Sequence, residues 1–230
     1  MRWHHETRVA LIVLGMHRSG TSAVAGMLRH LGIDFGPDLI PAAADNPRGF
    51  WEHREIVEIH ELLLGSLASN WNDYRALPEN WMNFPFTDHV RERLAAVIWR
   101  DFSHQWIFGI KDPRLCRLLT LWIPLLAKSS IEPRFILVWR DPIEIAASLA
   151  QRDGMTTAHA IALRQRYLDE AVAGIRNYPS TFVRYSDLIG CRGWRFIARQ
   201  ISRDLDVRWP RWDARAVRAY LTPTLRHHRI

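Results

Sequence analysis

Cysteine and long apolar segments are both scarce in this chain of 230 residues. Its two cysteines, Cys116 and Cys191, form neither a CxxC pair nor a metal-ligand spacing, so the sequence predicts no disulfide framework and no metal site. No segment approaches the roughly 20 apolar residues that span a bilayer, and the run after Arg8 that could pass for a signal peptide is cut off at His17. We therefore expect a protein that does not span a membrane and that resides in the cytoplasm.

Apolar residues are nevertheless plentiful enough for a core. Hydrophobic residues make up 48% of the chain and charged residues 24%, which excludes a disordered chain, a collagen-like repeat and a disulfide-rich miniprotein. The length favours a single domain over residues 1–230, since two ordinary domains and a linker would need more. The formal net charge of +7 favours anionic partners, and no feature singles out a specific nucleic acid among them.

The hydrophobic pattern alternates between short apolar runs and helical spacing. The runs predict four buried strands, at 9–14, 106–110, 134–139 and 181–185. Helical spacing follows the first run and recurs at about 52–67, 88–99, 157–177 and 191–202. Such alternation is typical of a three-layer α/β fold with a central parallel sheet. The long Gly- and Pro-containing loop at 32–50 is expected to border a functional site.

Two of the predicted strands end in the same way. Lys111-Asp112-Pro113 follows one strand and Arg140-Asp141-Pro142 follows another. An aspartate can cap the helix that comes next, and proline fits the first turn of that helix. A helix is therefore expected to start directly after each of these two strands.

The loop after the first strand, Gly15-Met-His-Arg-Ser-Gly-Thr-Ser22, is the strongest candidate for an anion-binding site. A turn between a strand and a helix presents backbone N–H groups to a bound anion. Its outer spacing is that of a P-loop, GxxxxGxS. However, Thr21 stands where a nucleotide triphosphatase carries lysine, and the loop's cation is Arg18, which weakens a triphosphate interpretation.

A second candidate is formed by Arg140 and Ser148, which lie two helical turns apart. Arg140 could bind a phosphate through its forked donors while Ser148 adds a hydroxyl. Alternatively, Arg140 pairs with Asp141 or another nearby carboxylate, and Ser148 is a small helix residue. Sequence reasoning alone leaves both interpretations open.

With these motifs, the sequence resembles the sulfotransferase family that uses 3′-phosphoadenosine 5′-phosphosulfate (PAPS), in its bacterial carbohydrate-type variety. Five motifs occur in the family's order between Arg8 and Leu188: GMHRSGTS, NxxGFxE, KDPR, RDPxxxxxS and YxDL. The resemblance implies that the 5′-phosphosulfate is bound by Arg18, Ser19, Gly20, Thr21 and Ser22. It implies that the 3′-phosphate is bound by Arg140 and Ser148, that Tyr185 lies near the adenosine, and that Arg226 belongs to a basic segment closing over the cofactor.

Transfer of the sulfuryl group requires a base for the acceptor hydroxyl. The candidates are Glu52, His53, His17 and Asp112. The resemblance favours Glu52, which ends the NPRGFWE segment, although an acidic residue in the first turn of a helix is also an ordinary structural feature. Lys111 is expected to support the charge that develops on the transferring group or the bridging oxygen, without any metal.

The resemblance also bears on the acceptor. Arg18 and Pro113 occupy the places where cytosolic aryl and steroid sulfotransferases carry a loop lysine and a catalytic histidine. We therefore expect a glycan or glycolipid hydroxyl, such as a bacterial surface polysaccharide precursor, rather than a small phenol. Three aromatic residues could stack on sugar rings or simply cover the core: Trp71, Tyr74 and Trp81.

Two alternatives stay open, a P-loop kinase of small molecules and a degenerate module that only binds nucleotides or polyanions. The arginine-rich stretch from Arg192 to Arg211 is interpreted as a solvated helix face and receives no specific role.

Overall fold

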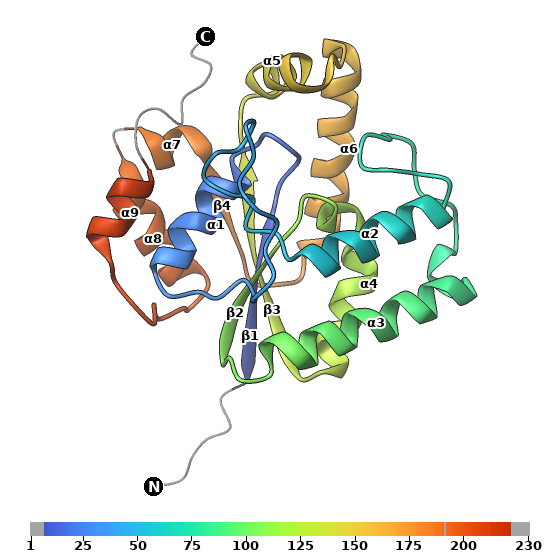
Figure 1. Ribbon diagram of the computed structural model, residues 1–230, viewed down its shortest axis with the longest axis horizontal. Helices are drawn as coiled ribbons and strands as arrows, with labels where there is room; N and C mark the ends of the chain where they lie inside the picture. Colours follow the sequence, from blue (N-terminus) through green and yellow to red (C-terminus); the bar gives the residue numbers. More distant parts are fainter. Residues whose placement is uncertain (1–6, 191, 222–230) are drawn as a thin grey trace, which may run out of the picture.

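A parallel β-sheet forms the centre of the computed structural model, which describes residues 7–190 and 192–221 (Figure 1). Its strand order is β2-β1-β3-β4, and every neighbouring pair is parallel. The strands are β1 (Arg8–Leu14), β2 (Ile107–Lys111), β3 (Ile131–Trp139) and β4 (Ser180–Arg184). All four strands expected from the sequence are therefore present, each shifted at its ends by three residues or fewer.

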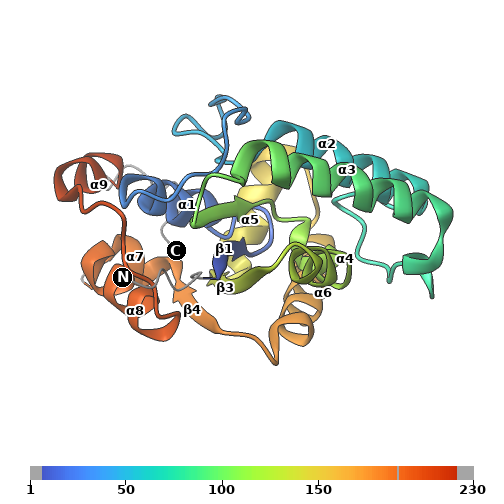
Figure 2. The same cartoon turned by 90° about the horizontal axis from the view of Figure 1, so that it is seen from below.

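Helices cover both faces of this sheet (Figure 2). The longer ones are α1 (Thr21–His30), α2 (Arg54–Ser66), α3 (Pro85–Phe102), α4 (Leu115–Lys128), α5 (Pro142–Asp153), α6 (Thr157–Ile175) and α8 (Gly193–Asp204). The shorter ones are α7 (Tyr185–Ile189), α9 (Ala214–Tyr220) and a 3-10 turn, η1 (Trp81–Asn83). Sequence reasoning did not find α7 and α9, because five and seven residues are too few to establish a helical period.

Alternate side chains of β1 define two cores. Ala10, Ile12 and Leu14 pack with residues of α2 to α6 on one face of the sheet. Val9, Leu11 and Val13 pack with residues of α1, α8 and α9 on the other. Because both faces are covered, the strand is apolar throughout instead of alternating with polar residues. The three-layer α/β fold expected from the sequence is confirmed.

The helix starts expected after β2 and β3 are also confirmed. Asp141 Oδ1 accepts a hydrogen bond from the backbone N–H of Ile143 at 2.8 Å, and Pro142 occupies the first turn of α5. Asp112 Oδ1 likewise accepts from the N–H of Arg114 at 3.0 Å just before α4. The helix expected at 88–99 is longer, since it starts at Pro85, where proline is again tolerated in the first turn, and continues to Phe102.

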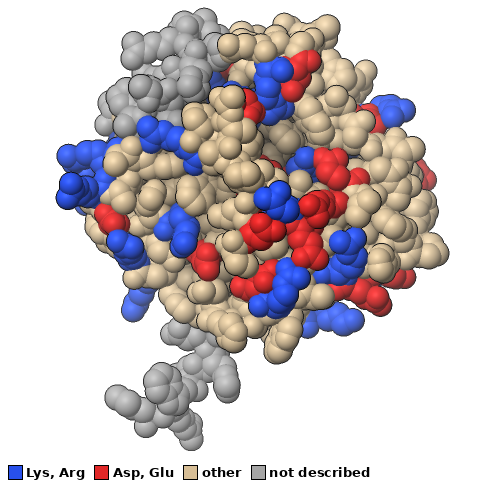
Figure 3. All heavy atoms as spheres, in the orientation of Figure 1, with Lys and Arg blue, Asp and Glu red and all other residues tan. Residues whose placement is uncertain are grey.

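The arginines of the C-terminal part lie on the surface, as expected. On the face drawn in Figure 3, basic side chains gather at the left, where α8 and α9 lie in Figure 1. Arg192, Arg195, Arg199, Arg203, Arg208 and Arg211 are all exposed. None of the described helices is long and apolar enough to cross a membrane.

Strand order decides where a site can form. In the sheet, β2 lies on one side of β1 and β3 lies on the other. Because the strands are parallel, the loops that follow these three strands meet at one edge of the sheet. Ligands of open α/β sheets bind at such a point, beyond the carboxyl ends of the strands.

Candidate active site

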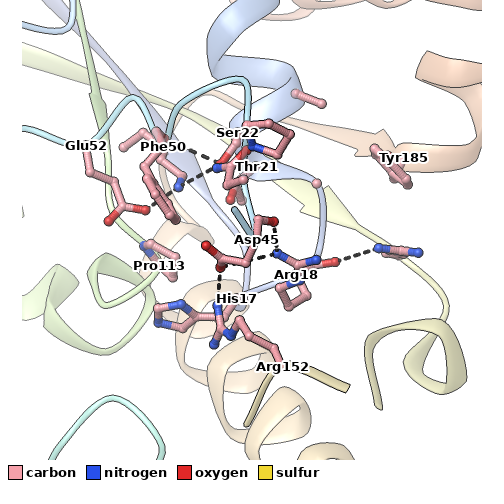
Figure 4. Close-up of a pocket in the computed structure, with 16 residues that line it drawn as sticks. His17, Arg18, Thr21, Ser22, Asp45, Phe50, Glu52, Pro113, Arg152 and Tyr185 are labelled. Atoms are coloured by element: carbon pink, nitrogen blue, oxygen red, sulfur yellow. Dashed lines mark hydrogen bonds and ion pairs between the residues drawn. The ribbon is translucent and has the colours of Figure 1, made fainter. Parts of the chain in front are cut away.

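A cavity of about 110 Å³ lies at this edge of the sheet (Figure 4). Its lining includes eight of the residues selected from the sequence: Arg18, Gly20, Thr21, Ser22, Glu52, Lys111, Arg140 and Tyr185. Ser19 and Ser148 are buried beside it, each 2% exposed. Arg226 lies outside the described residues. The structure thus brings together residues from five motifs that are distant in sequence.

The loop that joins β1 to α1 has the tight backbone expected of an anion cradle. Gly15 and Gly20 have φ of +147° and +93°, and Arg18 has φ of +67°. A Cβ on Gly20 would lie 2.2 Å from the Tyr185 ring, so only glycine fits there. Helix α1 starts without a side-chain cap and without an acidic residue in its first turn. Its free N–H groups therefore remain available to a bound anion.

The side chain of Arg18 contacts α5 and the long loop before α2. Its Nε donates to the Ser148 hydroxyl at 2.7 Å, and one terminal nitrogen donates to the backbone carbonyl of Asp45 at 3.0 Å. The Asp45 carboxylate lies 3.7 Å from the same nitrogen and 3.8 Å from Arg152. Burial, followed by the charge of Arg152, lowers the pKa of Arg18. An anion bound beside these two guanidinium groups would, like the Asp45 carboxylate, reduce the repulsion between them.

Arg140 shows one of the two interpretations that the sequence left open, the pairing with a nearby carboxylate, while its binding of a phosphate stays a prediction. It pairs with a carboxylate, but that of Glu144 at 2.6 Å, whereas Asp141 caps α5. Another nitrogen of Arg140 donates to the backbone carbonyl of Arg18 at 3.0 Å, and the guanidinium lies 5.0 Å from the centre of the Tyr185 ring. Arg140 is 9% exposed and lines the cavity, so it remains accessible to an anion there.

Glu52 and Lys111 form an ion pair at the other side of the cavity. Both side chains are buried, and Lys111 Nζ also lies 3.3 Å from the hydroxyl of Ser22. Burial raises the pKa of Glu52, and the charge of Lys111 opposes this shift without cancelling it. In Figure 4, Glu52 lies on one side of the cavity and Arg18 and Tyr185 on the other. The cavity thus lies between the Glu52 carboxylate and the loop that joins β1 to α1.

Two of the four candidate bases, Asp112 and His53, pair with side chains that do not line the cavity. Trp122 Nε1 donates to His60 Nε2 at 2.7 Å, so the proton on His60 Nδ1 points to Asp112, also at 2.7 Å. Although burial opposes it, the charge of Arg114 and the hydrogen bond from His60 hold the pKa of Asp112 far below its usual range. His53 pairs with Asp101 at 3.0 Å. Neither Asp112 nor His53 lines the cavity.

His17 is the other candidate base that does line the cavity. Its ring packs against Trp71, with 4.6 Å between ring centres, and its Nε2 is buried without a hydrogen-bond partner among the described residues. Burial and the charges of Arg114 and Arg152 lower the pKa of His17 well below its usual value. The imidazole is therefore neutral at neutral pH.

The three aromatic residues that could stack on a sugar have different environments. Trp81 belongs to the core and is 8% exposed. Trp71 packs between the ring of His17 and the guanidinium of Arg152. Tyr74 is 45% exposed and contacts another side chain of the surface. None of the three lines the cavity, which supports a structural role for Trp71 and Trp81.

Sequence reasoning missed several residues of the site. Asp45, Asn46 and Phe50 come from the long loop that was expected to border a site, and Arg152 lies one turn beyond Ser148 on α5. The Asn46 amide donates to the Ser22 hydroxyl at 3.1 Å and to the carbonyl of Gly49 at 2.8 Å. The asparagine of the NxxGFxE motif thus ties the loop to α1. The position of Asn46 in this motif was the sequence signal that could have identified it as a residue of the site.

Comparisons with known proteins show which solved structure has a similar fold. No family model and no curated protein matches the sequence. Among solved structures, the chain is similar to the sulfotransferase domain of the Synechococcus PCC 7002 olefin synthase, with a TM-score of 0.53 and 15% sequence identity. The alignment covers 100% of this chain and 87% of that domain. The chain therefore has the α/β fold of a sulfotransferase domain.

Among the described residues, no group of three or more His, Cys, Asp or Glu side chains is arranged to hold a metal ion.

Proposed function

We propose that this protein transfers a sulfuryl group from PAPS to the hydroxyl of an acceptor. The observation that carries the proposal is the placement of the Glu52–Lys111 pair and the Arg18 loop around one cavity. A carboxylate on one side and an anion cradle on the other are what in-line transfer between a hydroxyl and a phosphosulfate requires. The sulfotransferase fold supports the same reaction class.

The donor fits the cationic side of the cavity. We assign the 5′-phosphosulfate to the loop and the first turn of α1, through Arg18, Ser19, Gly20, Thr21 and Ser22. The 3′-phosphate is assigned to Arg140 and Ser148, and the adenosine to the neighbourhood of Tyr185. These assignments are supported by the uncapped start of α1 and by the two arginines that converge beside it. Arg226 belongs to the same proposal as part of a closing segment.

The chemistry assigned to the chain is a single displacement. Glu52 accepts the proton of the acceptor hydroxyl as the acceptor oxygen bonds to sulfur and the bond from sulfur to the bridging oxygen breaks. Lys111 stabilises the negative charge that moves onto the bridging oxygen, and the adenosine bisphosphate leaves with the bonding electrons. Because Lys111 pairs with Glu52 before reaction, proton uptake by Glu52 frees the ammonium for the leaving group.

The acceptor is assigned to the glycan or glycolipid class, such as a bacterial surface polysaccharide precursor. The polar residues His17, Asp45 and Arg152 also line the cavity, and such groups can hydrogen-bond an acceptor with several hydroxyl groups. We further propose that the chain works as one sulfotransferase-like domain in the cytoplasm, in keeping with the sequence.

Calorimetric titration tests the donor assignment directly. Three ligands are compared, namely 3′,5′-adenosine bisphosphate, AMP and Mg-ATP. We expect a clear preference for the bisphosphate, because only it carries a phosphate for Arg140 and Ser148. Preference for Mg-ATP would replace the proposal by a P-loop kinase, and binding of none of the three would favour the degenerate module.

A further inference from the structure

Three parts of the chain that are far apart in sequence meet at the ring of Tyr220. This residue ends α9, is 9% exposed, and packs on the backbone of α1 at Gly26, where an added Cβ would lie 2.1 Å from the ring. Trp51, from the loop before α2, packs against the same ring with 5.9 Å between centres. Burial raises the pKa of Tyr220 to about 12, so its hydroxyl stays protonated at neutral pH.

The Tyr220 hydroxyl uses both of its hydrogen-bonding capacities toward the candidate site. It accepts a hydrogen bond from Trp51 Nε1 at 2.9 Å. It donates one to the backbone carbonyl of Ser22, also at 2.9 Å. Ser22 lines the cavity and its side chain lies near Lys111, while Trp51 immediately precedes Glu52. One hydroxyl therefore bonds both to the residue that precedes Glu52 in the chain and to the residue whose side chain lies near Lys111.

The backbone at Trp51 shows why such a contact matters. Trp51 has φ of +61°, a left-handed conformation that a large side chain adopts only where surrounding contacts hold it. This turn directs the Trp51 ring toward Tyr220 while Glu52 faces Lys111 on the other side of the chain. Relaxation of the turn would change the direction of the Glu52 carboxylate.

A second attachment joins the same loop to α9. Arg48 donates to the backbone carbonyl of Ala219 at 2.9 Å and to that of Tyr220. Its guanidinium lies 5.7 Å from the centre of the Tyr220 ring. The segment from Asn46 to Glu52 is thus fixed at Arg48 and Trp51 to the end of α9 and at Asn46 to Ser22.

We propose that Tyr220 is a positioning residue, through which α9 holds Ser22 and the Glu52 backbone in reactive geometry. This inference rests on the proposed function for its effect on turnover. Its structural part, that the Tyr220 hydroxyl restrains the segment 46–52, does not depend on the reaction.

The test compares Tyr220→Phe with Tyr178→Phe, which also removes one phenolic oxygen but from a tyrosine that packs on Phe135 outside the cavity. Phenylalanine keeps the ring on Gly26, so the variant should fold. We expect amide hydrogen exchange in the segment 46–52 to increase about tenfold in Tyr220→Phe and to stay unchanged in Tyr178→Phe, because hydrogen bonds that hold the turn are lost.

Turnover and donor affinity provide the second readout. Release of labelled sulfuryl from PAPS should fall about tenfold in kcat for Tyr220→Phe, whereas affinity for 3′,5′-adenosine bisphosphate should fall about twofold at most, since the hydroxyl contacts the donor cradle through the backbone carbonyl of Ser22 and not through a side chain assigned to the donor. Trp51→Phe removes the other partner, and the double variant should lose no more than the larger single loss. Unchanged exchange in Tyr220→Phe overturns the proposal, and so does an equal loss of kcat and bisphosphate affinity.

The two proposals fail separately. If the wild-type protein neither binds the bisphosphate nor releases sulfuryl, the proposed function is wrong, and the exchange comparison still decides whether Tyr220 restrains the segment 46–52.

Discussion

Arg18 and Ser148 are joined by a hydrogen bond of 2.7 Å, although 130 positions separate them in the sequence. In the proposed function, Arg18 serves the 5′-phosphosulfate and Ser148 the 3′-phosphate. Their contact means that the two ends of the donor site share a hydrogen bond. A change at one end should therefore be detectable at the other.

Ser148→Ala tests this sharing. We expect affinity for 3′,5′-adenosine bisphosphate to fall about fivefold, as for one lost hydroxyl hydrogen bond, and affinity for AMP to change as well because Arg18 loses its partner. Calorimetry measures both. Ser129→Ala, at the end of α4, removes a half-buried hydroxyl that donates to the backbone carbonyl of Leu125 and does not line the cavity, and it serves as control. Unchanged AMP affinity in Ser148→Ala would argue against the shared hydrogen bond.

Arg140→Ala should weaken bisphosphate binding by about tenfold or more and AMP binding much less, because a hydrogen-bonded charge to the 3′-phosphate is lost. Arg91→Ala, which removes a surface ion pair with Asp88 on α3, is the matched control and should change neither. Equal losses for both ligands would contradict the assignment of the 3′-phosphate to Arg140.

Glu52→Gln should lower kcat at least about 100-fold, since glutamine cannot accept the acceptor proton, while bisphosphate affinity stays within about threefold. Sulfuryl transfer and calorimetry measure the two effects. Glu132→Gln, which removes a surface carboxylate paired with Arg134, is the control. Transfer that survives in Glu52→Gln would move the role of base to His17, the other candidate base at the cavity.

The pH dependence of kcat/KM gives an independent check on Glu52. Burial raises its pKa, and the base must be deprotonated to act. Activity should therefore increase with pH along a limb that lies above the range of an unperturbed glutamate, about 4.3. The limb should be absent from the residual activity of Glu52→Gln and retained in His17→Asn. A limb in the ordinary glutamate range would show that Glu52 is not the titrating base.

The pKa of Asp112 is shifted in the opposite direction from that of Glu52, and this shift affects the stability of the fold. Its pKa is lowered in the folded protein, so its contribution to the free energy of unfolding is present above the unfolded-state pKa of about 3.9 and is lost as pH falls through and below that value. Asp112→Asn should cost about 3 kcal/mol at pH 7, because the buried Arg114 and His60 lose a charged partner. Urea unfolding between pH 7 and 3.5 should show the difference narrowing only at the acid end. A constant difference over this range would contradict the assignment.

Much of the fold could be predicted from local patterns. The apolar run at 9–14 is long enough for a strand and too short for a membrane helix, and Asp141 with Pro142 marks the start of α5 by capping chemistry within a few residues. Short helices escaped prediction, as α9 shows. Its seven residues carry no clear period, and it is stabilised by packing on α1.

The sequence by itself determined that this protein is a parallel α/β chain, and it predicted an anion-binding loop after the first strand, because periodicity and turn chemistry act between near neighbours. Only the tertiary structure decided that Glu52 meets Lys111, and that Asp112 and His53 are engaged elsewhere. It also decided that Tyr220 reaches Ser22. Such contacts depend on strand order and on how helices pack across the sheet, and neither is encoded by the spacing of residues within one motif.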